Sequence, residues 1–169
     1  MDNSSRYAIL TEFGKKLLNK PSLSEGLVLI SHTAKELLHA HRCSIYIYDQ
    51  KNTELWTTLS DGIQKIRISA DKGLAGHTLQ EKKPIICNDP YNNPHFLKEI
   101  DEKSGYLTQN IATAPIFDSY RHIIGVLQLL NKEGGFDNED LKFMIFFAHY
   151  VSTYLELAAM FGDENEYIC

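Results

Sequence analysis

The hydrophobic pattern of the chain changes at Cys43, from helical spacing to the strict alternation of a strand. Upstream, a capping box at Ser22 and Glu25 opens an amphipathic helix that extends to about His41 and should cover a sheet or pair with a neighbouring helix. Downstream, the alternation predicts a strand that ends at Asp49. Its two faces are expected to carry Cys43, Ile45 and Ile47 on one side and Ser44, Tyr46 and Tyr48 on the other.

The remaining segments supply more strands and helices. Strands are expected at residues 54–59, 65–69, 84–87, 110–117 and 122–131. Helices are expected at 5–19, 97–103 and 137–161, with a further short helix that ends near Gln80. Turn residues connect the first three strands in meander order, which predicts an antiparallel sheet and an α+β fold. Long connections between the middle strands should form the lid of a pocket.

Size and composition favour a single domain. The 169 residues, 43% of them hydrophobic, suffice for one full core. We expect an N-terminal helix and linker at 1–22, the domain at 23–161 and a tail at 162–169. A formal net charge of −5 argues against nucleic-acid binding. Because the sequence contains neither a long apolar run nor a signal peptide, we expect a cytoplasmic protein without a membrane partner.

The sequence lacks the residue patterns of catalytic or metal sites. Cys43, Cys87 and Cys169 are spaced neither as a disulfide framework nor as a zinc site. His39 and His41 have no carboxylate or cysteine at ligand spacing, so no metal site is expected. No nucleophile elbow or P-loop is present either. The residues that could recognise a ligand are instead small hydroxyls, amides and backbone donors around the expected pocket. They predict binding without turnover and without a cofactor.

The terminal helix carries two apolar faces and therefore needs two partners. Leu141, Met144, Ala148, Val151, Leu155 and Ala158 form the face expected to cover the sheet. The opposite face is predicted to form a homodimer through Phe143, Phe147, Tyr150, Tyr154, Leu157 and Phe161. Alternatively, the first helix of the same chain covers this second face.

The corner between the last strand and the terminal helix has the composition of a structural clamp. Gly134 and Gly135 permit positive φ angles in the turn. Lys132 and Asp140 place opposite charges on its two sides and can tie the strand to the helix.

A second glycine-bearing turn, at 71–77, leads into the short helix that ends near Gln80. Free backbone N–H groups at such a helix start attract anions, although a plain loop-to-helix turn explains the same residues.

Taken in order, several short motifs resemble a GAF domain over residues 23–161. They are Arg42-Cys43-Ser44-Ile45, Ile66-Arg67-Ile68, Gly73-Leu74-Ala75-Gly76-His77, Asn110-Ile111, Gly125-Val126 and Asn131-Lys132 followed by Phe136-x-x-x-Asp140. The sequence is most similar to the regulatory GAF domains of cyclic-nucleotide phosphodiesterases and bacterial adenylate cyclases. The resemblance implies a six-stranded antiparallel sheet flanked by helices, a buried cyclic-nucleotide pocket, and a role in dimeric signalling proteins.

The resemblance also assigns roles to individual residues. The pocket is expected to use Ser44, Ser60 and Asp61 toward the base, Ala75 and Gly76 toward the cyclic phosphate, Asp101, Ser104 and Thr108 in the lid, and Gln128. A structural brace outside the pocket is expected from Asn131, Lys132, Phe136 and Asp140. Gln128 stands where family members that bind cyclic nucleotides often carry Glu, which should alter selectivity, because an amide both donates and accepts. Two further departures are Leu141 in place of a usual Glu and a short loop before the third strand.

Three functions follow as hypotheses. The leading one is a sensory domain that binds cyclic AMP, cyclic GMP or another small molecule and signals along its terminal helix. The second is a dimerisation scaffold whose vestigial pocket is filled by side chains such as Tyr46 and Phe96. The third is reduction of free methionine sulfoxide by clustered cysteines, for which Cys43 and Cys87 lack a resolving partner nearby in the sequence.

Overall fold

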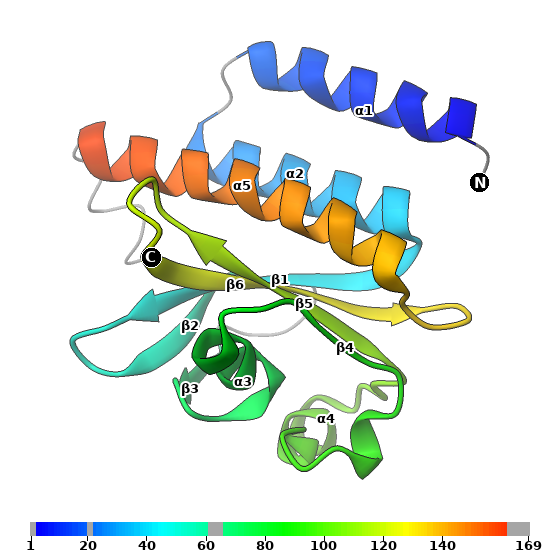
Figure 1. Cartoon of the computed structure of the whole chain (residues 1–169), viewed down its shortest axis with the longest axis vertical. Helices are drawn as coiled ribbons and strands as arrows, with labels where there is room; N and C mark the ends of the chain where they lie inside the picture. Colours follow the sequence, from blue (N-terminus) through cyan, green and yellow to red (C-terminus); the bar gives the residue numbers. More distant parts are fainter. Residues whose placement is uncertain (1–2, 20–21, 61–65, 162–169) are drawn as a thin grey trace.

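The computed structural model describes residues 3–19, 22–60 and 66–161, and Figure 1 shows their arrangement. Its helices are α1 (Asn3–Leu18), α2 (Leu23–Leu38), α3 (Gly73–Glu81), α4 (Lys98–Ser104) and α5 (Asn138–Phe161), with a 3-10 turn at Pro90–Asn92. Its strands are β1 (Ala40–Asp49), β2 (Glu54–Ser60), β3 (Arg67–Ser69), β4 (Ile85–Cys87), β5 (Ile111–Phe117) and β6 (Ile123–Lys132). The strands form one sheet in the order β3-β2-β1-β6-β5-β4, with every neighbouring pair antiparallel. The six-stranded antiparallel sheet and the α+β class are thus confirmed.

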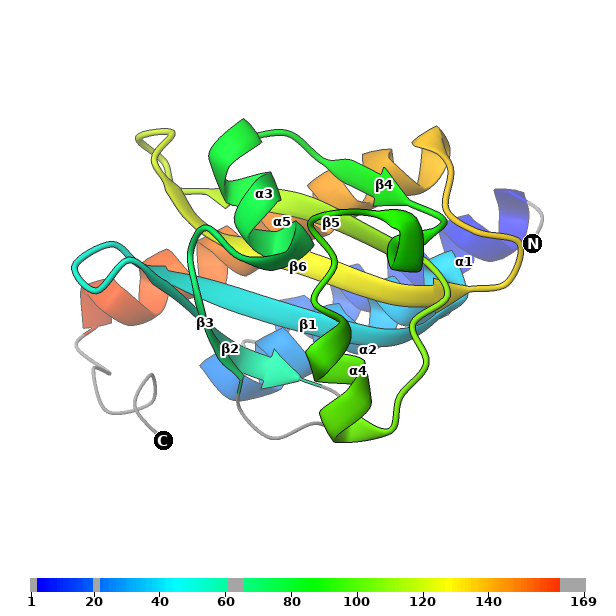
Figure 2. The ribbon, with the colours of Figure 1, turned by 90° about the horizontal axis from the view of Figure 1, so that it is seen from below.

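Helices cover the sheet on both faces. Helices α2 and α5 lie against one face, and α1 forms a further layer above them (Figure 1). Helices α3 and α4 lie on the opposite face, as Figure 2 shows from below. The larger core fills the space between the sheet and α2 and α5, and smaller apolar clusters lie under α3 and α4.

The predicted alternation of β1 is confirmed. Cys43 and Ile45 belong to the core under α2 and α5, whereas Tyr46 packs with Leu55 and Val126 on the α3 side. Strand β1 begins at Ala40, earlier than predicted, because Ala40 already pairs with Lys132 of β6. This central strand thus points successive side chains into the two apolar layers on either side of the sheet.

The ends of α2 agree with the capping signals in the sequence. The Ser22 hydroxyl accepts a hydrogen bond from the Glu25 N–H, and the Glu25 carboxylate accepts one from the Ser22 N–H at 2.8 Å. The helix ends at His39, which adopts the left-handed conformation with φ of 53°. The predicted turn at residues 60–62 extends outside the described residues.

Helices of the same chain cover much of the aromatic face of α5, as the alternative to the predicted dimer surface expects. Phe13 of α1 packs edge-on against Phe147 and Tyr150, with ring centroids 5.6 and 5.2 Å apart. Phe147 is completely buried, and Gly26 of α2 lies directly against the Tyr154 ring. Phe147 and much of the Tyr150 and Tyr154 rings therefore belong to the core of one chain. Arg6 likewise covers Phe143, whereas Leu157 is 45% exposed and the side chain of Phe161 lies outside the described set.

Candidate functional site

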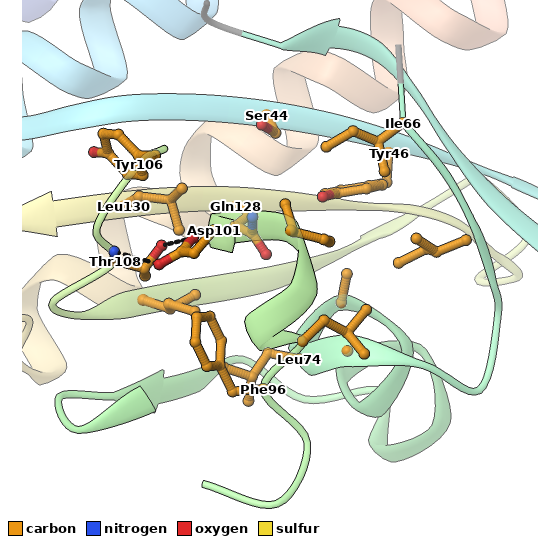
Figure 3. A pocket seen from close by; sticks show the side chains of 16 residues that line it. Ser44, Tyr46, Ile66, Leu74, Phe96, Asp101, Tyr106, Thr108, Gln128 and Leu130 are labelled. Carbon is orange, nitrogen blue, oxygen red and sulfur yellow. Dashed lines mark hydrogen bonds between the residues drawn. The ribbon is translucent and has the colours of Figure 1, made fainter. Parts of the chain in front are cut away.

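A cavity of about 50 Å³ lies between the sheet and the segment that carries α3 and α4 (Figure 3). Strands β1 and β6 supply its floor, and α3, α4 and the connections around them supply its walls. The polar side chains that line it are Ser44, Tyr46, Asp101, Tyr106, Thr108 and Gln128. The apolar ones are Ile66, Ile68, Leu74, Ala75, Phe96, Leu97, Ile100, Ile111 and Leu130, and Gly73 completes the lining.

Five of the predicted ligand residues lie around this cavity: Ser44, Ala75, Asp101, Thr108 and Gln128. Gly76 and Ser104 lie outside it. The Gly76 N–H donates to the Lys72 carbonyl within α3, and the Ser104 hydroxyl donates to the Asp101 carbonyl at the end of α4. Gly76 serves packing instead, because a Cβ there would lie 2.7 Å from the Ala70 carbonyl oxygen. Asp61 and the side chain of Ser60 are outside the described residues.

The floor carries two neighbouring polar side chains, Tyr46 and Gln128. Burial raises the pKa of the Tyr46 hydroxyl to about 12, and the nearby Gln128 amide opposes part of that shift. Ser44 is the direct cross-strand partner of Gln128, so the three side chains lie on one patch of the sheet. This patch presents a hydroxyl, a phenol and an amide, which can match both donors and acceptors of a ligand.

One wall of the cavity is the start of α3. Lys72 precedes the helix without a side-chain cap, and the first turn of a helix leaves its N–H groups without intrahelical acceptors. Leu74 and Ala75 of that turn are buried and face the cavity. Gly73 has φ of +73°, and a Cβ there would lie 3.1 Å from Leu97. Because Gly73 has no side chain, the backbone at the start of α3 can lie close to Leu97. The uncapped N–H groups of this turn lie beside the cavity, where an anion can bind.

Hydrogen bonds to the Asp101 carboxylate hold the lid, residues 88–108, in its closed conformation. The carboxylate accepts hydrogen bonds from the Thr108 N–H at 2.6 Å, the Thr108 hydroxyl at 2.7 Å and the Tyr91 hydroxyl at 2.9 Å (Figure 3 shows Asp101 and Thr108). The acceptance by Asp101 raises the pKa of Tyr91. These bonds close the loop between α4 and β5, and Asp101 is the one carboxylate among the described lining residues.

Tyr106 is a lining residue that sequence reasoning missed. The Arg42 guanidinium lies 3.6 Å from its ring centroid, and the His41 ring stacks on it at 5.7 Å. The His41 Nδ1 is also 2.9 Å from the Tyr106 hydroxyl. Burial raises the pKa of Tyr106, and the nearby Arg42 opposes that shift. Arg42 and His41 belong to β1, so only the folded sheet brings them to the lid, and no local signal announces the contact.

The predicted brace lies beside the cavity, and none of its residues lines it. The Lys132 ammonium contacts both oxygens of Asp140, at 2.6 and 2.5 Å. Asn131 holds the C-terminal end of the lid. Its side chain accepts a hydrogen bond from the Gln109 N–H and donates one to the Leu107 carbonyl, each at 2.7 Å. The Phe136 N–H and carbonyl pair with the Asn88 side chain. The corner therefore joins β6, α5 and both ends of the lid.

The two described cysteines lie on opposite faces of the sheet. Cys43 belongs to the core under α2 and α5, and Cys87 belongs to the apolar cluster that includes Leu74 and Ile111. Both are buried, and Asn93 donates a hydrogen bond to the Cys87 sulfur at 3.4 Å. Cys43 and Cys87 therefore cannot form the clustered pair that the methionine sulfoxide hypothesis needs.

No group of three or more His, Cys, Asp or Glu side chains is placed to hold a metal ion within residues 3–19, 22–60 and 66–161. No helix in that part of the chain is long and apolar enough to cross a membrane.

Comparison with known proteins identifies the family. The family model described as GAF domain matches residues 22–155. A probable 3′,5′-cyclic phosphodiesterase of Caenorhabditis elegans is 26% identical over 155 residues, which cover 83% of this chain but 21% of that protein. The chain thus spans about a fifth of the length of this curated relative.

Solved structures show the same fold. The GAF domain of a phosphoenolpyruvate-protein phosphotransferase from Coxiella burnetii has a TM-score of 0.83 and 21% identity, covering 95% of this chain and 99% of that one. A free methionine-R-sulfoxide reductase from Neisseria meningitidis, in complex with its substrate, has a TM-score of 0.77 and 18% identity, with 95% and 94% covered. Because the family model matches most of the sequence, the chain belongs to the GAF domain family.

Proposed function

We propose that this GAF domain is a non-catalytic sensory domain whose cavity receives a cyclic nucleotide, cyclic AMP or cyclic GMP. The observation that carries the proposal is the uncapped first turn of α3, which faces the cavity opposite the hydrogen-bonding floor of Tyr46 and Gln128. The helix start suits the cyclic phosphate, and the amide of Gln128 suits a purine edge. The cyclic phosphodiesterase relative supports this ligand class.

The charges around the cavity leave the start of α3 as the main binding partner for a phosphate group. Among the described lining residues there is no Lys, Arg or His, and Asp101 is a carboxylate. A phosphate therefore has backbone N–H groups and the helix dipole as its positive partners. The Asp101 oxygens already accept three hydrogen bonds, which directs the carboxylate toward the lid and away from a ligand.

The lid must move for a nucleotide to enter. The cavity volume of about 50 Å³ lies well below the roughly 300 Å³ at which small-molecule pockets begin. Tyr46 and Phe96 both line it, and Phe96 belongs to the lid. Binding should therefore displace the 88–108 connection and pass the change through the brace to α5.

Isothermal titration calorimetry of the 169-residue chain with cyclic AMP and with cyclic GMP tests this function. We expect saturable binding of at least one of them. Gln128→Glu should change the ratio of the two affinities, whereas the matched exposed variant Gln80→Glu should leave it unchanged. Absence of heat and of a thermal shift at millimolar concentrations of both nucleotides would rule the proposal out.

A dimerisation scaffold with a vestigial cavity is the second candidate. The small cavity volume and the presence of Tyr46 and Phe96 in the lining favour it. Its homodimer would use the uncovered part of α5 around Leu157, which is 45% exposed. Sedimentation of the chain and of Leu157→Lys distinguishes the candidates, because a scaffold dissociates on this change and gains nothing from added nucleotide.

A further inference from the structure

A second and larger cavity, of about 290 Å³, opens where the end of α3 meets β5 and α5. It shares no lining residue with the first cavity. Helix α3 reaches both, because its first turn faces the first cavity and Lys82, just after its last turn, lines the second. The second cavity lies outside every motif by which the sequence resembles its family.

Three basic side chains surround this cavity: Lys82, Arg121 and His149. All three are exposed, and no acidic side chain lines the cavity among the described residues. The chain as a whole has 22 acidic and 17 Lys or Arg residues, so an all-basic rim is not its average surface. Such a rim attracts anions and holds them weakly unless apolar contacts add to the charge.

Two of the rim cations lie in tight turns of the backbone. Lys82 has φ of 54° and Arg121 has φ of 65°, the left-handed conformation in which glycine or asparagine is the usual residue. Lys82 ends α3, and Arg121 lies in the turn between β5 and β6. Two separate turns therefore each bring a cation to the rim of the same cavity.

The floor of the cavity is apolar. Pro115 and Ala148 are buried, Phe117 is half-buried, and Ile145 is 40% exposed although it is a large aliphatic residue. A volume of about 290 Å³ is close to the lower end of the range for small-molecule pockets. A ligand that matches this site has an apolar ring or short chain that covers Phe117 and Ile145 and a negative group that meets the rim.

We propose that the cavity between α3, β5 and α5 is a second binding site, for a small organic anion with an apolar body, such as an aromatic sulfonate, carboxylate or phosphate. The aromatic part covers the apolar floor and excludes water from it. The anionic group lies between Lys82, Arg121 and His149. The site is independent of the cyclic-nucleotide proposal, since the two cavities share no residue.

Titration with 8-anilinonaphthalene-1-sulfonate, a fluorescent aromatic sulfonate, tests the site in the whole chain. We expect saturable binding of one molecule per chain. The double variant Lys82→Gln/Arg121→Gln should weaken this binding by roughly tenfold. The control Lys15→Gln/Lys51→Gln removes the same charge from two exposed lysines elsewhere and should bind like the parent.

A second variant and a map of the bound position make the test decisive. Ile145→Glu places a negative charge in the apolar floor and should therefore abolish binding of the dye. Circular dichroism should show an unchanged fold, because the Ile145 side chain is 40% exposed. Amide chemical-shift changes should cluster at residues 82–84, 115–121 and 145–149. Equal binding by the Lys82→Gln/Arg121→Gln variant, unsaturable binding, or shifts confined to the first cavity would each overturn the proposal.

Discussion

Lys132 and Asp140 form the most buried ion pair in the described part of the chain. Only 16% of the Lys132 side chain and 3% of the Asp140 side chain is exposed to solvent. Removing the cation from such a pair leaves a buried carboxylate without a counter-charge, and its remaining hydrogen bond comes from the Asp137 N–H. Lys132→Met should therefore lower the free energy of unfolding by about 3 kcal/mol or more, as urea denaturation would measure.

The surface pair Lys142–Glu139 provides the matched control for that change. It also joins a lysine to a carboxylate near the start of α5, but its side chains are 70% and 63% exposed. Lys142→Met should cost no more than about 1 kcal/mol, because water replaces the lost partner. Equal losses in the two variants would show that burial does not set the strength of the brace.

Tyr46 predicts how stability depends on pH in the alkaline range. Its pKa is raised to about 12 in the folded chain because its hydroxyl is fully buried, whereas an unfolded tyrosine titrates near 10. Between these values the unfolded chain loses a proton that the folded chain keeps, so folding stability is intact below pH 10 and falls as pH rises toward 12.

Tyr46→Phe should remove this part of the pH dependence. The loss of stability between pH 9 and pH 11 should be smaller in the variant by about 1 kcal/mol, measured by urea denaturation at both pH values. Comparing the change between the two pH values cancels any pH-independent effect of removing the Tyr46 hydroxyl. Parallel curves for the two proteins would mean that Tyr46 ionises in the folded chain as easily as in water.

At the scale of elements, Asn131 connects strand β6 to the far end of the lid. It has φ of 56°, so glycine can adopt its backbone conformation, whereas alanine is strained there. Asn131→Gly therefore removes the bonds to Leu107 and Gln109 without adding strain. Amide hydrogen exchange at Gln109 and Asn110 should become faster, while exchange in the middle of β6 stays slow.

Asn131→Ala serves as the comparison. It loses the same bonds and adds a strained backbone, so its unfolding free energy should fall below that of Asn131→Gly by about 1 kcal/mol. If exchange at Gln109 is unchanged in both variants, the lid is held by Asp101 alone.

Local patterns predicted elements well and contacts between them poorly. Successive side chains of any strand point to opposite faces of its sheet, so the period of two places Cys43 and Ile45 on one face and Tyr46 on the other. The contact of Tyr106 with Arg42 depends on how a loop folds back over β1, which no period encodes. Gly76 illustrates the same limit: its place in a glycine-rich turn suggested phosphate binding, but its N–H is used inside α3 and its missing side chain makes room for Ala70.

For the whole molecule, the decisive question is what covers the aromatic face of α5. The sequence correctly required a second partner for that helix but could not say whether it came from the same chain, because both partners offer the same kind of apolar stripe. The structure shows that α1 takes that place. Phe13 is 2% exposed and belongs to the main core, so the folded unit includes α1 as well as the segment that matches the family model.

A variant that lacks residues 1–21 should therefore expose Phe146, Phe147 and Tyr150 and associate with itself as concentration rises, which sedimentation velocity would measure. Phe13→Ala should lower the free energy of unfolding of the full chain by about 3 kcal/mol or more through loss of its ring contacts. Leu18→Ala, at a side chain that is 80% exposed in the same helix, should have little effect. If the truncated chain associates, the aromatic face accepts either α1 or a second copy, and α1 then limits self-association as well as completing the core. A truncated chain that stays monomeric with unchanged stability would show that α1 does neither.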